Sequence, residues 1–174
     1  MKRTLAAICC LFLASLPALA QKKTTVGKPM TDQQFVDFAA QTDMMEANLG
    51  QLAANTASSQ QVKDYASTLV TEHTTDYGQL STAAKQANLN VPNALDTEHN
   101  KMIAPFQKLK GAAFDRKYAH EMVAGHTKAI EIYKKEASDA QNDAIKSYAQ
   151  TALPVLEKHL SSAKDLEKAK PSTK

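Results

Sequence analysis

Hydrophobic residues recur every three to four positions through most of the chain, and no stretch alternates convincingly with a period of two. A period near 3.6 is typical of an amphipathic α-helix, whereas alternation would indicate strands. Four long windows have the helical period, and they predict helices over residues 32–57, 59–87, 111–137 and 139–169. The hydrophobic pattern therefore predicts an all-α fold.

Short sequence signals mark where these helices begin. A serine or threonine three residues before a glutamine forms a capping box, in which each side chain bonds the backbone of the other residue. Three such pairs precede the predicted helices: Thr31 and Gln34, Ser58 and Gln61, and Ser138 and Gln141. Asn88 is a plausible stop for the second helix. The first two helices, and the last two, are joined by very short connections, which predict antiparallel hairpins.

The connection between the second and third helices, residues 89–110, is much longer. It contains Pro92 and a short helical piece around residues 96–109. Part helix and part extended chain, it could span roughly 40 Å, which is about the length of one long helix. We therefore expect a ferritin-like antiparallel four-helix bundle with a long second connection that contains a short helix. A crossover along the bundle and an up-down-up-down arrangement with a folded-back connection both fit the pattern.

The first 20 residues have the order of a secretory signal peptide. A basic start, Lys2-Arg3, precedes an apolar run over residues 5–16 and the small-x-small motif Ala18-Leu19-Ala20. This order predicts cleavage after Ala20 and export to the periplasm. Both cysteines, Cys9 and Cys10, lie inside the predicted signal, so the mature chain would contain no thiol. No other segment is long and apolar enough to span a membrane.

The predicted cleavage divides the chain into four parts. Residues 1–20 are the signal, residues 21–30 a flexible tail, residues 31–169 the bundle domain and residues 170–174 a second tail. Cleavage removes two positive charges and no acidic residue, so the formal net charge falls from +3 to +1. The chain has no basic stripe and no nucleic-acid motif, and we expect no nucleic-acid partner. The pattern identifies no protein partner.

Three of the five histidines occupy apolar stripes. His73, His126 and His159 each lie on the stripe of a different predicted helix, and Glu46 lies at the edge of the stripe of the remaining one. Three of these four positions are close to the midpoints of their helices, and His159 lies about 7 Å beyond its midpoint. Because helices of equal length share a midplane, we expect the four side chains to lie in one layer.

A buried layer of this kind needs a chemical explanation. An ionised carboxylate or an unpaired imidazole inside a bundle costs several kcal/mol unless it is paired or bound to a metal. Imidazole suits copper, zinc and iron, and Glu46 adds negative charge. Asp76, one turn after His73, is a further candidate ligand or could orient that ring. No motif for an organic cofactor is present, so the candidate cofactor is a transition metal ion held by Glu46, His73, His126 and His159.

Four further observations bear on the interpretation as a metal site. Met45 and Met122 flank the layer and would favour copper(I), although methionine on such a stripe is more often core filling. His99 and His120 lie outside the layer and are expected to be solvated. No glutamate is followed three residues later by a histidine, so the motif of di-iron carboxylate proteins is absent. Pro154 removes one hydrogen bond near the middle of its helix, and a kink there would bring His159 closer to the layer.

The same residues carry a family resemblance over essentially the whole mature chain. It rests on the segments FVDFAAQTDMMEANLG, VKDYASTLVTEH, GAAFDRKYAHEMVAGH and LPVLEKHL. Together they resemble the exported bacterial family called domain of unknown function (DUF) 4142, which is placed among ferritin-like folds. The resemblance implies a ferritin-like bundle outside the cytoplasm and brings no established reaction. Asp115 and Tyr118 match the family motif but lie too far from His126 to join its layer, and we expect them to make capping or inter-helix hydrogen bonds.

Two functions of different classes follow. The first is a periplasmic protein that binds a transition metal for sequestration, tolerance or sensing. The second is a metal-free structural or stress-response bundle in which the buried His/Glu layer hydrogen-bonds to itself and sets the packing register. A redox enzyme is the weakest alternative, because no catalytic nucleophile and no cofactor motif is found.

Overall fold

The computed structural model describes residues 30–169, and within that range every regular element is a helix. The all-α prediction is therefore confirmed. The predicted signal peptide, nearly all of the first predicted tail and the second predicted tail lie outside the described residues. The four long helices are α1 (Asp32–Thr56), α2 (Gln60–Gln86), α4 (Gly111–Asp139) and α5 (Asp143–Lys168). Two short helices, α3 (Thr97–Ile103) and η1 (Phe106–Lys108), lie in the long connection.

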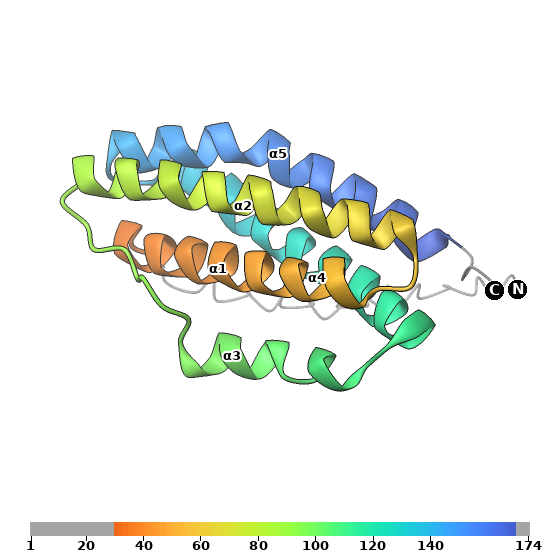
Figure 1. Ribbon diagram of the computed structural model, residues 1–174. Helices are drawn as coiled ribbons and strands as arrows, with labels where there is room; N and C mark the ends of the chain where they lie inside the picture. The colour runs from red at the N-terminus through yellow and green to blue at the C-terminus, as the bar shows by residue number, and fades with distance from the viewer. Residues whose placement is uncertain (1–29, 170–174) are drawn as a thin grey trace, which may run out of the picture.

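The long helices form two hairpins that pack side by side. Helices α1 and α2 are joined through residues 57–59, and α4 and α5 through residues 140–142 (Figure 1). Because these connections are so short, the two helices of each hairpin are antiparallel. Within the described residues, no helix is both long enough and apolar enough to cross a bilayer.

Hydrogen bonds between helix ends settle how the two hairpins are joined. Asp32, at the start of α1, accepts from the backbone N–H groups of Gln141 and Asn142, just before α5, at 3.0 and 2.8 Å. Asp115, near the start of α4, accepts from the backbone N–H groups of Ser58 and Ser59, just before α2, at 3.0 and 2.9 Å. Helices α2 and α4 therefore start at the same end of the bundle.

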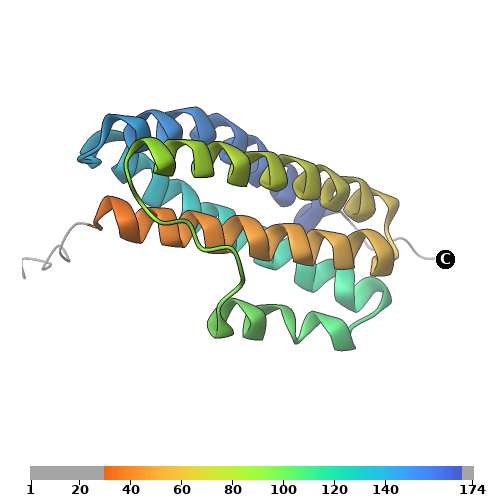
Figure 2. The same ribbon diagram turned by 60° about the vertical axis from the view of Figure 1, so that its left-hand side comes forward.

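It follows that the connection between α2 and α4 crosses the length of the bundle. Figures 1 and 2 show this connection, with α3 standing outside the four long helices. Gln41 of α1 holds the connection in place, because its side chain donates to the carbonyl of Ala94 and accepts from the N–H of Asp96. Of the two topologies that the sequence left open, the structure has the crossover.

Some of the predicted helix ends agree with the structure, and others do not. The capping box of Thr31 and Gln34 is confirmed. Asn88 ends α2 with a φ of 55°, a conformation that asparagine tolerates better than most residues. Two predicted boxes were wrong. The N-cap of α2 is Ser59, because the Ser58 hydroxyl bonds Asp115 of another helix instead. Ser138 lies inside α4, and the side chain of Asn142 caps α5.

Pro154 does not divide its helix. Helix α5 runs without interruption from Asp143 to Lys168, with Pro154 inside it. The proline is exposed, and its ring therefore lies on the outer face of the helix. Pro154 has no N–H group, so the backbone carbonyl of Gln150 loses its usual helical donor. Gln150 is exposed, and water can donate a hydrogen bond to this carbonyl instead.

The buried apolar side chains form two clusters, one toward each end of the bundle. One cluster includes Phe35 and Ile145, near the starts of α1 and α5, and the other includes Leu69 and Phe114, nearer the starts of α2 and α4. On each long helix, a polar buried residue separates the part that enters one cluster from the part that enters the other. The polar residues thus occupy a layer between two apolar halves.

Candidate metal centre

Each long helix contributes one ionisable side chain to this middle layer. Glu46 comes from α1, His73 from α2, His126 from α4 and His159 from α5, and the four residues are 1, 2, 0 and 3% exposed. The helical stripe explains their burial, because each lies three to four residues from apolar neighbours that face the core. The structure therefore brings together all four residues that the sequence singled out.

The three imidazole rings surround one point. The centroid of the His159 ring lies 5.2 Å from the centroids of both other rings, which are 5.8 Å from each other. One nitrogen from each ring can be chosen so that all three lie within 4.8 Å of one another. The Oε2 atom of Glu46 lies 2.9 Å from Nε2 of His73 and 3.3 Å from Nε2 of His126.

The inward atoms of this cluster have no aligned hydrogen bond. Seven buried side-chain atoms lack a hydrogen-bond partner among the residues that the structure describes, and four of them face the centre of this cluster: His73 Nε2, His126 Nε2, His159 Nδ1 and Glu46 Oε2. The contacts with Glu46 have the length of ion pairs but not the direction of hydrogen bonds. Leaving several buried polar atoms unpaired in one place is costly, and such a group needs a chemical explanation.

The outward nitrogen of every ring, by contrast, is held by an oxygen. Nδ1 of His73 lies 2.8 Å from Oδ1 of Asp43, and Nδ1 of His126 lies 2.9 Å from the backbone carbonyl oxygen of Met122. Nε2 of His159 bonds the carboxylate of Glu72. An N–H donated to such an oxygen leaves the other ring nitrogen with its lone pair directed inward. Histidines that bind metals in proteins are held in this way.

The spacing of the inward atoms is close to that of a metal site. Ligands at about 2.0–2.1 Å from a tetrahedral ion lie about 3.4 Å apart. The nitrogens are within 4.8 Å of one another, so they need to approach by no more than about 1.5 Å. Three imidazole nitrogens and one carboxylate oxygen form a ligand set that suits zinc, copper(II) or iron.

Burial and charge shift the pKa values of the surrounding groups. Burial lowers the pKa of His159 to about 4, against the opposing hydrogen bond with Glu72. Burial alone would lower the pKa of His73, but the charge of Glu46 and the hydrogen bond with Asp43 raise it to about 10. Burial would raise the pKa of Glu46, but the neighbouring histidines lower it to about 2. Without a metal, His73 and Glu46 therefore form a buried ion pair, and a bound ion would displace the proton of His73.

Other candidate residues lie away from the inward atoms. Asp76 accepts a hydrogen bond from the Tyr148 hydroxyl at 2.7 Å. The interpretation that it orients His73 was wrong, because both ring nitrogens of His73 face Asp43 and Glu46 instead. His99 and His120 pair with Asp96 and Glu167 outside the layer, and their side chains are 24 and 71% exposed. Met122 contributes its backbone carbonyl to the cluster.

Two residues of the cluster were missed from the sequence. Asp43 is 2% exposed and holds His73, and Glu72 holds His159. A signal for Asp43 was present, because it precedes Glu46 by three residues and so shares its helical face. Glu72 gives no such signal, because it lies on the polar face of α2 and its side chain is 32% exposed.

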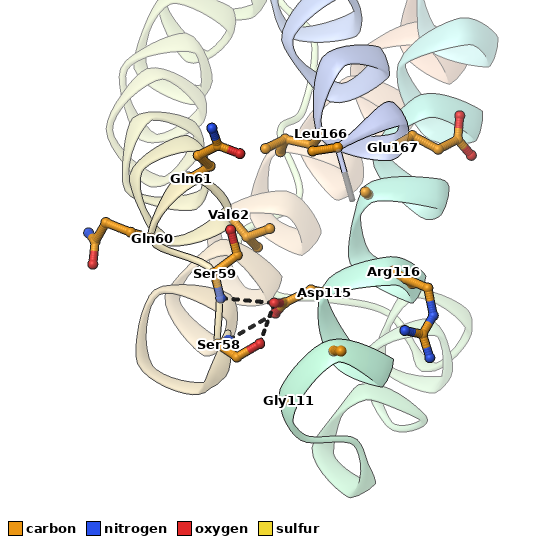
Figure 3. A pocket seen from close by; sticks show the side chains of 13 residues that line it. Ser58, Ser59, Gln60, Gln61, Val62, Gly111, Asp115, Arg116, Leu166 and Glu167 are labelled. Carbon is orange, nitrogen blue, oxygen red and sulfur yellow. Dashed lines mark hydrogen bonds between the residues drawn. The ribbon is translucent and has the colours of Figure 1, made fainter. Parts of the chain in front are cut away.

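A separate hollow lies at the end of the bundle where α2 and α4 begin. Figure 3 shows Asp115 between α4 and the turn before α2, bonded to Ser58 and Ser59. This carboxylate already satisfies the N–H groups at the start of α2, as expected for a capping residue. The hydrogen bond expected of Tyr118 is not found, because its hydroxyl has no partner among residues 30–169. Among the described residues, those that line the hollow include no cluster of candidate metal ligands.

Comparisons with known proteins agree with the helical architecture. A crystal structure described as a DUF305 secreted protein from Streptomyces coelicolor is similar to this chain, with a TM-score of 0.60 and 14% sequence identity. The similarity covers 84% of this chain and 100% of that one. At such low identity it supports the fold alone. Comparison with curated proteins gives no significant match. The family model described as domain of unknown function (DUF4142) matches residues 16–166, and the chain therefore belongs to the DUF4142 family.

Proposed function

We propose that this protein binds a transition metal ion through Glu46, His73, His126 and His159. The ion lies in the middle layer of the bundle, with one ligand from each long helix. The protein serves sequestration, tolerance or sensing of the metal, and no catalytic step is assigned to it.

One observation carries this proposal. Each of the three histidines has its outward nitrogen held by an oxygen acceptor and its inward nitrogen without an aligned partner. A layer that served packing alone would be expected to pair its inward atoms with one another, because unpaired buried groups destabilise the fold. A metal ion in the centre satisfies all four inward atoms at once.

The ligand types favour zinc or copper(II), with iron as a third choice. Imidazole nitrogens are intermediate in softness, and a single carboxylate lowers the charge of a divalent ion. Cys9 and Cys10 lie inside the predicted signal peptide, so the mature chain would offer no thiolate ligand. A single ion fits this arrangement better than a pair, because a pair of ions needs several bridging carboxylates.

The fold and the location form part of the proposal. We infer a ferritin-like bundle, because the crossover makes α2 and α4 parallel while each hairpin is antiparallel. We also infer export to the periplasm, on the basis of the signal-like order of residues 1–20. The similarity to a protein described as secreted supports this location.

A metal-free structural role is the competing function, and one observation favours it. The raised pKa of His73 and the lowered pKa of Glu46 describe an ion pair that needs no metal. In that case the layer would set the packing register of the bundle, as buried polar residues do in coiled coils. The two functions make opposite predictions for added metal.

Thermal unfolding separates these functions. A ligand that binds only the folded state stabilises it by about 2.7 kcal/mol at a hundredfold excess over Kd, which for a domain of this size is several degrees in Tm. We expect zinc or copper(II) to raise the Tm of the parent protein near pH 7.5. The variants His73→Ala and His126→Ala should lose this shift, because each removes a ligand.

The matched controls are His99→Ala and His120→Ala, which remove histidines outside the layer and should keep the shift. A parent protein whose Tm is unchanged by either metal, with His73→Ala merely less stable, would favour the structural role instead.

A further inference from the structure

The three histidines of the layer differ in where their holding groups lie. Asp43, which holds His73, is 2% exposed, and the carbonyl that holds His126 belongs to Met122, which is also 2% exposed. Glu72, which holds His159, is 32% exposed. His159 is thus the ring whose outer partner reaches solvent, so the layer is closest to the surface between α2 and α5.

A small hollow lies at the same place. It is lined by residues of α2 and α5 and has a volume of about 10 Å³, which is room for about one water molecule. Buried His73 and His159 form its inner wall, and Val155, which is 40% exposed, lies on its outer side. A single small ion fits a space of this size, whereas a larger ligand does not.

The charges around the hollow favour a cation. Glu72 and Asp76 both line it, and a spacing of four residues places them on the same face of α2. Lys158 opposes them, at 3.5 Å from Glu72, but its side chain is 68% exposed. An exposed pair of this kind is weak and exchanges readily with solvent. Two carboxylates at a narrow opening raise the local concentration of cations.

We propose that metal ions reach the layer between α2 and α5, past Glu72 and Val155. The carboxylate of Glu72 attracts the arriving ion, and His73 and His159 are the ligands of the layer that line the hollow. This proposal rests on the metal-binding function, and it adds the route by which the ion enters.

The rates of binding test the route separately from the affinity. A residue that only narrows a path changes association and dissociation by the same factor, because it raises the barrier and leaves both end states unchanged. We expect Val155→Phe to slow both rates for zinc about tenfold with the Kd unchanged. Stopped-flow mixing with zinc, followed by release to a chromophoric chelator, measures the two rates. Ser161→Phe adds the same ring at an exposed position of α5 outside the hollow and should leave both rates unchanged.

The charge of Glu72 gives a second test. Glu72→Gln retains an oxygen that can accept from His159 and removes only the negative charge. We expect zinc association to slow about 3- to 10-fold at low salt, with the difference shrinking as ionic strength rises. The matched control is Glu157→Gln, because Glu157 pairs with Lys134 of α4 and does not line the hollow.

Different results would contradict the metal-binding function and the route of entry. A parent protein that binds no zinc contradicts the metal function itself. A parent that binds zinc, with rates that neither Val155→Phe nor Glu72→Gln alters, overturns the route and leaves the function standing. Equal slowing of both rates by Val155→Phe, without any effect of Ser161→Phe, supports the route.

Discussion

His73 makes the densest set of polar contacts in the layer. Its Nδ1 faces Asp43 at 2.8 Å and its Nε2 faces Glu46 at 2.9 Å, and all three side chains are almost fully buried. Burial raises the pKa of Asp43 to about 7, against the opposing effect of its hydrogen bond with His73. Because Asp43 accepts the proton on Nδ1, the lone pair of the neutral ring is placed on Nε2, where a metal needs it.

Removing the charge of Asp43 should therefore weaken metal binding without removing a ligand. We expect Asp43→Asn to raise the Kd for zinc about 10- to 100-fold, the usual cost of losing a group that holds a ligating histidine. Competition with a chelator of known affinity measures this change. Asp37→Asn changes an exposed carboxylate on the same helix and should bind zinc like the parent. Equal affinities for Asp43→Asn and the parent would show that Asp43 does not support the site.

The four inward residues could be predicted from the sequence because each breaks an apolar stripe near the middle of its helix. The holding groups could not be predicted as readily. Asp43 comes from α1 and acts on a ring of α2, and Glu72 comes from α2 and acts on a ring of α5. Such contacts depend on the rotation of neighbouring helices, which helical periodicity does not specify. Asp76 was the wrong choice for His73 because Asp43 and Glu46 already face the two ring nitrogens.

The end of α4 carries an acidic group in an unusual setting. Glu136 is 4% exposed, and its Oε1 has no hydrogen-bond partner among the described residues. Burial raises the pKa of Glu136 to about 7, and the nearby charge of Asp32 adds to this effect. Asp32 itself is committed to the N–H groups before α5, so it cannot move away. The folded protein therefore favours the protonated form of Glu136.

This shift predicts how stability depends on pH. The pKa of Glu136 is higher in the folded chain than its ordinary value of 4.5, so its contribution is full below about pH 4.5 and is lost as pH rises through about 7. Glu136→Gln resembles the protonated form. We expect it to be more stable than the parent by about 1 to 3 kcal/mol at pH 8 and nearly equal at pH 4. Urea unfolding at the two pH values measures the difference.

The control for this prediction is Glu131→Gln, which neutralises an exposed glutamate of the same helix and should have little effect at either pH. A variant Glu136→Gln that is less stable than the parent at pH 8 would mean that the ionised carboxylate is stabilising where it lies. The contribution of the histidine layer to pH dependence is common to all three proteins and cancels in the comparison.

Some features of the overall architecture could be predicted from the sequence, and others could not. The helical period and the short connections specify two antiparallel hairpins, because both depend on residues close together in the chain. How the hairpins are joined depends on residues far apart, such as Asp115 with Ser58 and Asp32 with Gln141. These hydrogen-bonded pairs bring helix ends together, and no local sequence pattern predicts them. The length of the connection permitted the crossover without requiring it.

The layer at the centre of the bundle is the feature on which the proposed function rests. Two apolar clusters lie on either side of it, and together they shield the layer from water. A dry setting strengthens the attraction between a cation and Glu46. It also makes the same four side chains costly to retain without a ligand or a complete set of pairings.

The metal content of the protein purified from the cells that naturally make it tests the central claim most directly. The preparation should contain neither a chelator nor a histidine tag, and elemental mass spectrometry should count the metals bound per chain. The account predicts about one transition metal ion per chain, lost when His73, His126 and His159 are all replaced by alanine. A parent protein that is folded, carries no stoichiometric metal and takes up none when zinc or copper(II) is added would contradict it.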